Sequence, residues 1–303
     1  MVSVIITTFN RAHFLRRAIK SVLNQTYKDI EIIVVDDCSN DNTEKVVSEC
    51  IRNNKNIKYI RHNKNKGLSA ARNTGIKHST GKYISFLDDD DELLPKKIQK
   101  QVEFLEKHKN IDAIYCGYIR KSDNFEQVYI PKKITNFLKE SLILPLSVIH
   151  SLLIKKECFS KIGLFDENLK YFEDWDLWIR LSAEVNLAII NEPLVVYHIH
   201  GAQMMLSNLN EKINANHYIL AKHKNLFKRY KKSLFWNYRR LLTRYSLMDD
   251  YRNAFKYAIK AIKLNPLSLT TYVHLFLMLT NKKLQRRLIY KFGLRKIGNY
   301  YIL

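Results

Sequence analysis

The chain has 303 residues, of which 46% are hydrophobic, and a formal net charge of +22. This length and composition predict one or two globular domains with a sizeable core. No stretch reaches the roughly 18 to 20 apolar residues of a transmembrane helix, and the chain enters a strand-like run at Val2 without the basic region or cleavage site of a signal peptide. The four cysteines lie far apart and form no CxxC pair, which favours thiols in a reducing cytoplasm over a zinc site or a disulfide framework.

The charge is distributed unevenly. Residues 201–303 hold 21 Lys and Arg against three acids, a net charge of +18, whereas residues 1–200 carry +4. We therefore expect a first domain over residues 1–205 and a basic helical region over residues 206–303. Such asymmetry suggests contact with a polyanion, either a nucleic acid or an anionic membrane face. Leu284 to Ile297 has the amphipathic pattern of a helix that lies in a membrane interface.

Strand and helix signals alternate along the first part of the chain. β-Branched apolar runs predict strands at Val2–Thr7, Glu31–Val35, Ile57–Arg61, Tyr83–Leu87 and Ala113–Ile119. Helical spacing and helix boundaries predict helices at Phe14–Leu23, Thr43–Cys50, Leu68–Lys77 and Pro95–His108. This alternation predicts an α/β fold with a mostly parallel sheet, so ligand-binding residues are expected directly after the strands. The chain has neither the GxGxxG pattern of dinucleotide-binding domains nor the GxxxxGK(S/T) pattern of P-loops.

The signals are weaker in the middle of the chain. Residues 123–147 predict a variable loop or short helices. The elements expected after them are a strand at Val148–Ile154, a short helix at Lys156–Ile162, a helix within Tyr171–Leu181, and strand-like runs at Leu187–Ile190 and Leu194–Tyr197. After Gly201 the pattern becomes helical and basic.

Four consecutive carboxylates, Asp88 to Asp91, follow the predicted strand Tyr83–Leu87. Adjacent carboxylates repel one another, and a hard divalent cation such as Mg²⁺ or Mn²⁺ would relieve that repulsion. On a strand or a tight turn, Asp88 and Asp90 point the same way and Asp89 points away, so one pair is placed to share a ligand. The alternative is a solvated acidic turn in which Asp91 and Glu92 cap the following helix.

The segment KGLSAARNTG, Lys66 to Gly75, opens a helix. Free backbone N–H groups at a helix start attract anions, and Arg72 on the first turns is placed to reach a phosphate. The alternative is a well-capped helix that carries a surface arginine.

Two later segments carry further candidate groups. In YFEDWDLWIRL, Glu173 and Asp174 lie at a helix start beside aromatic residues, where a carboxylate can act as a positioned general base. The alternative is a helix whose acidic first turn complements the macrodipole. His198 and His200 are two residues apart, so they point the same way in an extended chain. Either could contact a metal or a phosphate; the alternative is that one is a packed core histidine.

Five segments together resemble family 2 glycosyltransferases with the GT-A fold. They are Val2 to Thr43, NKGLSAARNTG (Asn65 to Gly75), GKYISFLDDDD (Gly81 to Asp91), IGLFDE (Ile162 to Glu167) and FEDWDLWIRL (Phe172 to Leu181). The resemblance covers about the first 200 residues in order and spacing, and the basic region carries little of the family pattern. It implies a GT-A fold followed by the basic helical region.

The resemblance also implies a nucleotide-sugar site. Thr8, Asn10 and Arg11 would line the nucleotide pocket, and Asp36 would accept the imide N–H of a uracil-type base, since a carboxylate only accepts hydrogen bonds. Arg72 would face the diphosphate. The resemblance favours a UDP-sugar as the donor, because uracil nucleotides are common among members of this family.

A metal and a catalytic base are implied in the same way. Asp88 would meet the ribose, Asp89 would lie beside it, and Asp90 would bind Mn²⁺ or Mg²⁺. Asp174 would be the catalytic base of an inverting transfer. His200 stands where some members place a metal or phosphate ligand, although the segment HIHGAQM departs from the commoner form.

Three hypotheses follow from these patterns. The first is a cytoplasmic enzyme, peripheral on the inner face of the membrane, that builds bacterial surface polysaccharide on a saccharide or lipid-linked acceptor; its basic region would contact the anionic leaflet. The second is a nucleic-acid-binding protein with a vestigial enzyme domain. The sequence contains no known nucleic-acid-binding motif, so we expect no nucleic acid as a partner. The third is an inactive scaffold, against which the intact carboxylates argue.

Overall fold

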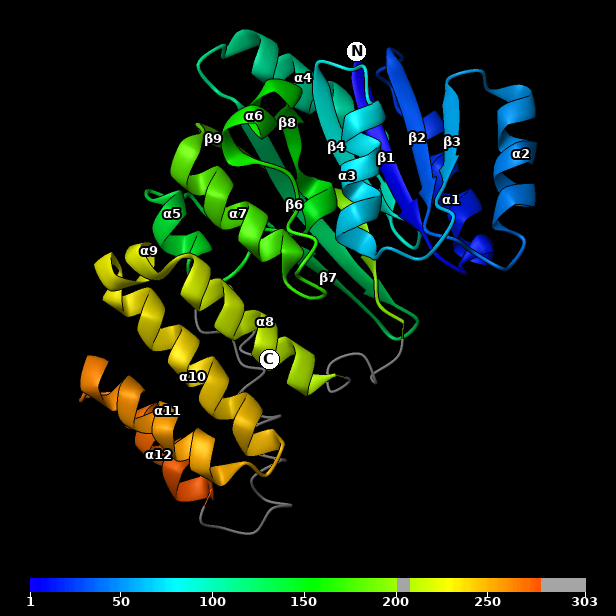
Figure 1. The fold of residues 1–303 in the computed structure, drawn as a ribbon. Helices are drawn as coiled ribbons and strands as arrows, with labels where there is room; N and C mark the ends of the chain where they lie inside the picture. Colours follow the sequence, from blue (N-terminus) through cyan, green and yellow to red (C-terminus); the bar gives the residue numbers. More distant parts are fainter. Residues whose placement is uncertain (201–207, 279–303) are drawn as a thin grey trace. The chain divides into compact units, whose positions relative to one another are not determined.

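A computed structural model describes residues 1–200 and 208–278 of the protein (Figure 1). The chain divides into two compact units. The first unit comprises Met1–Phe137 and Pro145–His200, and the second comprises Leu138–Leu144 and Gly201–Leu303. Within the described residues, no helix combines the length and the hydropathy that a membrane crossing requires. The predicted amphipathic segment Leu284–Ile297 lies outside the described residues.

The first unit is built on one mixed sheet with the strand order β3-β2-β1-β4-β8-β6-β9-β5, and β7 pairs with β6 (Figure 1). The strands are β1 (Val2–Thr8), β2 (Ile30–Asp36), β3 (Ile57–Arg61), β4 (Tyr83–Asp88), β5 (Glu92–Leu93), β6 (Ala113–Ser122), β7 (Phe125–Tyr129), β8 (Leu153–Lys155) and β9 (Leu187–His198). Strands β3, β2, β1 and β4 are parallel, as predicted. Strand β8 runs antiparallel to β4 and β6, so the second half of the sheet is mixed.

Helices cover both faces of this sheet. One face packs against α1 (Ala12–Leu23), α2 (Thr43–Asn53) and α4 (Lys97–Lys107), and the other packs against α3 (Leu68–His78), α6 (Phe159–Ile162) and α7 (Glu173–Glu184). Alternation along β1 explains this arrangement: Val4 and Ile6 enter the first core, while Ile5 enters the second. Burial on both faces accounts for the continuous apolar runs of the sequence.

Three segments differ from their prediction. Residues 123–147 contain the strand β7 and the short helix α5 (Phe137–Ser141). The predicted strand Val148–Ile154 begins instead with a 3₁₀ turn at Ile149–Ser151, because the backbone N–H and the hydroxyl of Ser151 both donate to the carbonyl of Val148. The two predicted strand-like runs after residue 186 form the single strand β9.

The second unit is helical in its described part. It contains α8 (Leu209–Lys222), α9 (Lys224–Arg229), α10 (Lys231–Leu247), α11 (Tyr251–Leu264) and α12 (Leu269–Met278). The segment Leu138–Leu144 belongs to this unit. Asn237 donates to the carbonyl of Leu142 at 2.9 Å, and Arg240 donates to the carbonyl of Ile143 at 2.6 Å, so α10 holds the segment through its backbone.

Candidate active site

The candidate site lies at the carboxyl edge of the parallel strands. Pairing aligns Thr8 at the end of β1 with Asp36 at the end of β2, and Thr7 with Asp88 at the end of β4. Ligands bind at this edge of open α/β sheets. The side chains of Thr8, Asp36 and Asp88 therefore start from the same edge of the sheet, where the site was predicted.

The acidic segment forms a turn after β4. The backbone N–H of Asp91 donates to the carbonyl of Asp88 at 3.2 Å, and in such a turn the first and fourth residues approach each other. The turn brings Asp91 next to Asp88, and the sharing of a ligand by Asp88 and Asp90 stays a prediction. The alternative of a solvated cap is wrong, since Asp91 is 1% exposed and α4 begins only at Lys97.

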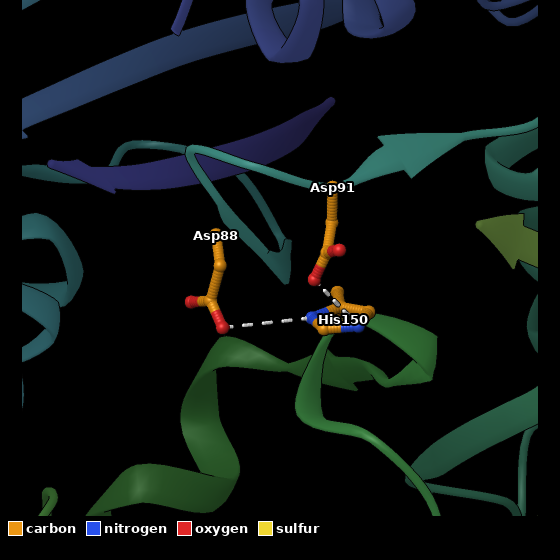
Figure 2. A group of neighbouring side chains, drawn as sticks. All are labelled: Asp88, Asp91 and His150. Carbon is orange, nitrogen blue, oxygen red and sulfur yellow. Dashed lines mark ion pairs between the residues drawn. The ribbon is translucent and has the colours of Figure 1, made fainter. Parts of the chain in front are cut away.

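His150 completes a group of three side chains with Asp88 and Asp91. Its Nε2 lies 3.1 Å from Asp91 Oδ2, and its Nδ1 lies 3.8 Å from Asp88 Oδ2. Figure 2 shows both carboxylates directed at the imidazole, which comes from the turn Ile149–Ser151. One ligand atom from each side chain fits within 4.8 Å of the others.

The group of Asp88, Asp91 and His150 is poorly satisfied by the protein itself. Burial lowers the pKa of His150 to about 4, so the ring is neutral. Burial, with Asp88 and Asp90 nearby, raises the pKa of Asp91 well above its usual value. The two ring nitrogens of His150 and Asp91 Oδ2 have no hydrogen-bond partner, because the 3.1 Å contact between them lacks hydrogen-bond geometry. Carboxylate and imidazole groups in this state suit a divalent cation.

Two buried side chains of α4 fix the backbone next to His150. The ammonium of Lys97 donates to Ser85 Oγ at 2.7 Å and to the carbonyl of Leu152 at 3.3 Å. Gln101 donates to the carbonyl of Ser151 at 2.8 Å. Burial lowers the pKa of Lys97 to about 8. These contacts hold the turn that presents the imidazole.

Arg11 binds the middle of the acidic turn. Its Nη1 lies 3.2 Å from Asp89 Oδ1 and 2.7 Å from Asp90 Oδ2. Burial raises the pKa of Asp89 to about 6, against the attraction of Arg11. The predicted donor-site residues Arg11 and Asp89 are thus adjacent to the predicted metal ligand Asp90.

His200 also lies next to Asp90, with 3.8 Å between Nε2 and Oδ2. Its ring stacks on Phe14 at a centroid distance of 4.4 Å. The rings of His198 and His200 are 6.2 Å apart and nearly parallel, as predicted for two residues in an extended segment. His198 is engaged otherwise, since its Nε2 lies 2.8 Å from Glu92 Oε1.

Arg72 connects the acidic turn to α7. It donates to Asp88 at 2.9 Å and to Glu173 at 2.8 Å, and its side chain is 2% exposed. The alternative of a surface arginine is therefore wrong. Although burial favours the neutral acid, Arg72 keeps the pKa of Asp88 below its usual value. In this structure two of the guanidinium donors contact carboxylates.

Asp174 lies on the first turn of α7. The helix starts after Phe172, whose backbone is left-handed with a φ of 65°, and Asp174 Oδ1 accepts the N–H of Trp175 at 2.7 Å. Burial, and secondarily the charge of Glu173, raises the pKa of Asp174 to about 7, while Arg72 opposes the shift. A carboxyl with this pKa exchanges a proton near neutrality.

Asp36 is almost fully buried at the end of β2. Its Oδ1 accepts the N–H of Ser39 at 2.8 Å, and its Oδ2 accepts the hydroxyl of Tyr59 at 2.6 Å. Two carboxylate oxygens have about four lone-pair positions. Arg61 Nε also lies 3.6 Å from Asp36 Oδ2, and beside these contacts the carboxylate has lone-pair positions for a further donor.

Thr8 and Asn10 follow β1. Thr8 is buried beside Asp36 in the sheet register. Asn10 has a φ of 55°, and its Oδ1 accepts the N–H of Asn40 at 2.8 Å. This contact ties the loop after β1 to the loop after β2, so the predicted pocket residues lie on two connected loops.

The family model for glycosyl transferase family 2 matches residues 3–163. The chain belongs to this family. An uncharacterised glycosyltransferase of Rickettsia prowazekii is 42% identical over 219 residues, covering 70% of this chain and 68% of the relative. An uncharacterised glycosyltransferase of Methanocaldococcus jannaschii is 32% identical over 234 residues, covering 74% and 79%. The resemblance inferred from the five segments is confirmed, and the chain is a family 2 glycosyltransferase.

Solved structures share the fold. TarS of S. aureus, residues 1–349 in complex with UDP-GlcNAc, aligns with a TM-score of 0.68 at 19% identity, covering 87% of this chain and 81% of that one. The mannosyltransferase PcManGT of Pyrobaculum calidifontis, in complex with GDP-Man and Mn²⁺, aligns with a TM-score of 0.61 at 17% identity, covering 95% and 84%. The predicted α/β GT-A fold of this glycosyltransferase is confirmed.

Sequence reasoning misses one residue of this glycosyltransferase site. His150 falls inside a predicted strand, and no local pattern connects it to Asp88 or Asp91. Glu173 is expected beside Asp174 at a helix start, but its sharing of Arg72 with Asp88 is not predicted. Only the tertiary fold brings these segments together.

Proposed function

We propose that the enzyme transfers a sugar from a nucleoside-diphosphate donor, with a UDP-sugar favoured, to a hydroxyl of a saccharide or lipid-linked acceptor in bacterial surface-polysaccharide synthesis. A single observation carries the proposal. Asp174, with a pKa of about 7, lies next to Glu173 in the network that Arg72 extends to Asp88. A base for hydroxyl activation requires such a pKa near the working pH.

In the proposed reaction Asp174 accepts the proton of the acceptor hydroxyl. The hydroxyl oxygen then forms a bond to the anomeric carbon, while the bond from that carbon to the diphosphate oxygen breaks. Attack opposite the leaving group inverts the anomeric centre. Holding the two reactants in line supplies much of the rate enhancement, on the order of 7–11 kcal/mol for well-oriented reactions.

The nucleotide would bind at the loops after β1 and β2. The Asp36 carboxylate accepts hydrogen bonds from Ser39 and Tyr59 and lies 3.6 Å from Arg61 Nε. Its remaining lone-pair positions support its predicted role as acceptor of an imide N–H. Thr8 and Asn10 would flank the base and ribose. TarS was solved with UDP-GlcNAc and PcManGT with GDP-Man, and we propose a donor of the same chemical class here.

A divalent cation, Mn²⁺ or Mg²⁺, fits the donor set of this site. Asp88, Asp91 and His150 would hold it, because one ligand atom of each lies within 4.8 Å of the others and the ligand atoms of Asp91 and His150 are buried without a hydrogen-bond partner. Asp90 and His200, 3.8 Å apart, are the second candidate position. When bound, the cation would supply positive charge for the diphosphate oxygens of the leaving group.

The basic region over residues 206–303 supports a membrane partner. We propose that the enzyme is cytoplasmic and peripheral on the inner face of the membrane, where a lipid-linked acceptor would be presented. Basic residues near an anionic leaflet each contribute about 1 kcal/mol. Nucleic acid is not a proposed partner.

A panel of sugar nucleotides tests the function. Turnover is measured with Mn²⁺, with Mg²⁺ and with EDTA, for wild type and for Asp174→Asn. We expect metal-dependent turnover of one donor, strongly reduced in the variant. UDP binding without turnover, when saccharide and lipid-linked acceptors are supplied, would favour a scaffold, and failure to bind any nucleotide would overturn the proposal.

A further inference from the structure

The helical unit leaves large apolar side chains in solvent. Leu267 is 92% exposed, Leu269 74%, Phe276 67% and Phe255 55%. The full set, here named the apolar surface of α11 and α12, consists of Phe255, Ile259, Leu267, Leu269, Tyr272, Val273 and Phe276. Exposed apolar side chains gathered in this number on two consecutive helices indicate an interaction site, whereas single exposed ones need no explanation.

On α11 these side chains occupy the face that points away from the core. Phe255 and Ile259 are four residues apart, so they are neighbours on the helix surface. Tyr257 and Ala261 lie on the opposite face and are buried. The exposed face is therefore a regular feature of the helix and not a frayed end.

The helix α12 has the same two-sided character. Leu269, Val273 and Phe276 recur at helical spacing on its exposed face. Thr271 and His274 are buried on the other side. Leu267 lies in the loop that joins the two helices and is the most exposed side chain of the set.

The charges along this surface have one sign. Residues 251–278 contain Arg252, Lys256, Lys260 and Lys263 and no Asp or Glu. Lys256 and Lys263 are exposed, and their spacing of seven residues places them on one side of α11. Lysine is depleted in protein interfaces, whereas lysine beside aromatic and aliphatic groups is typical of helices that lie in a membrane interface.

We propose that the apolar surface of α11 and α12 docks onto an anionic phospholipid bilayer. Its apolar side chains enter the headgroup and acyl boundary, and Lys256 and Lys263 contact lipid phosphates. A nucleic acid would use these charges but would leave Leu267 and Leu269 in water. The inference rests on the membrane partner proposed above and is independent of the catalytic roles.

The test is co-sedimentation of the full chain with vesicles of phosphatidylcholine alone or mixed with phosphatidylglycerol. Wild type binds the anionic vesicles. The variant Leu267→Ser/Leu269→Ser/Phe276→Ser loses at least about tenfold in partitioning, since each side chain contributes more than 1 kcal/mol when buried. Its matched control, Phe125→Ser/Val128→Ser/Ile130→Ser, changes exposed residues of the first unit and binds as wild type.

Two further measurements distinguish lipid docking from self-association and from an effect on catalysis. The variant Lys256→Gln/Lys263→Gln weakens binding only to the anionic vesicles, and donor turnover without vesicles is unchanged in every variant. Equal binding of wild type and the triple serine variant to anionic vesicles would overturn the inference. So would a wild-type dimer, seen by light scattering, that the triple serine variant converts to a monomer without loss of lipid binding.

Discussion

Nε2 of His150 lies 3.1 Å from Oδ2 of Asp91, and both side chains are almost fully buried. The contact lacks hydrogen-bond geometry, so both atoms are buried without a hydrogen-bond partner. A buried polar group without a partner costs about 1–3 kcal/mol. A bound cation would remove this cost for both groups at once.

We therefore expect His150→Gln and Asp91→Asn to weaken Mn²⁺ binding. Loss of one ligand should lower the affinity at least about tenfold, since even outer-shell partners contribute 10–100-fold. Calorimetric titration of the full chain measures it. The control His78→Gln changes a histidine outside the site, exposed and bonded to the carbonyl of Thr74. If only His200→Gln lowered the affinity, the cation would belong at Asp90 instead.

The pKa of Asp174 predicts a pH dependence. The carboxyl is protonated below about pH 7, so it cannot accept a proton there, and kcat/KM should fall as the pH drops through that value. Asp174→Asn should lower kcat about 10²–10⁴-fold and abolish this limb of the profile. Glu184→Gln, an exposed position at the end of the same helix, should retain the wild-type profile. A variant Asp174→Asn with an unchanged profile would assign the base elsewhere.

Removal of Arg72 should destabilise the first unit. The variant Arg72→Met leaves Asp88 and Glu173 as uncompensated charges, and breaking a buried pair costs about 3–5 kcal/mol. Arg72→Lys keeps the charge but cannot reach both carboxylates in the same fork, so its cost should be smaller. Urea unfolding measures both free energies. The double variant Arg72→Met/Glu173→Gln should recover part of the loss, and no recovery would contradict the bridge.

Glu31 predicts how stability changes with acid. Its carboxylate accepts hydrogen bonds from Ser3, Lys58, Thr80 and Gly81, which together lower its pKa to about 2 despite burial. A lowered pKa contributes stability above the unfolded value near 4.5, and this contribution is lost as the pH falls towards 2. Glu31→Gln should cost about 2–3 kcal/mol at neutral pH and less at pH 3. A difference that stays constant with pH would show that the charge of Glu31 does not matter.

Strands β1 and β2 could be predicted because a strand that is buried on both faces has a continuous run of apolar residues. The bounds of β1, β2 and β3 differ from their prediction by at most one residue at each end. The strand β7 was missed because its apolar residues Phe125 and Val128 are exposed and follow no alternation. Local signals are weak where a strand has no buried face.

The site was predictable where it follows directly from a strand end. Asp36 and Asp88 lie where parallel topology places ligand-binding groups. The partnership of Asp88 with Asp91 depends on one backbone hydrogen bond, and that of His150 depends on a turn stabilised by Ser151. Neither leaves a periodic pattern in the sequence, so only the folded chain reveals them.

The segment Leu138–Leu144 has a consequence for dissecting this enzyme. The chain passes from the first unit into this segment and returns to the first unit at Pro145. Within the segment, the carbonyls of Leu142 and Ile143 accept hydrogen bonds from Asn237 and Arg240. No single cleavage point therefore separates the units. A chain shortened after residue 205 would lack Asn237 and Arg240, so the carbonyls of Leu142 and Ile143 would lose these hydrogen-bond donors. The loop Leu138–Leu144 would then remain in the catalytic fragment without the helices that hold it.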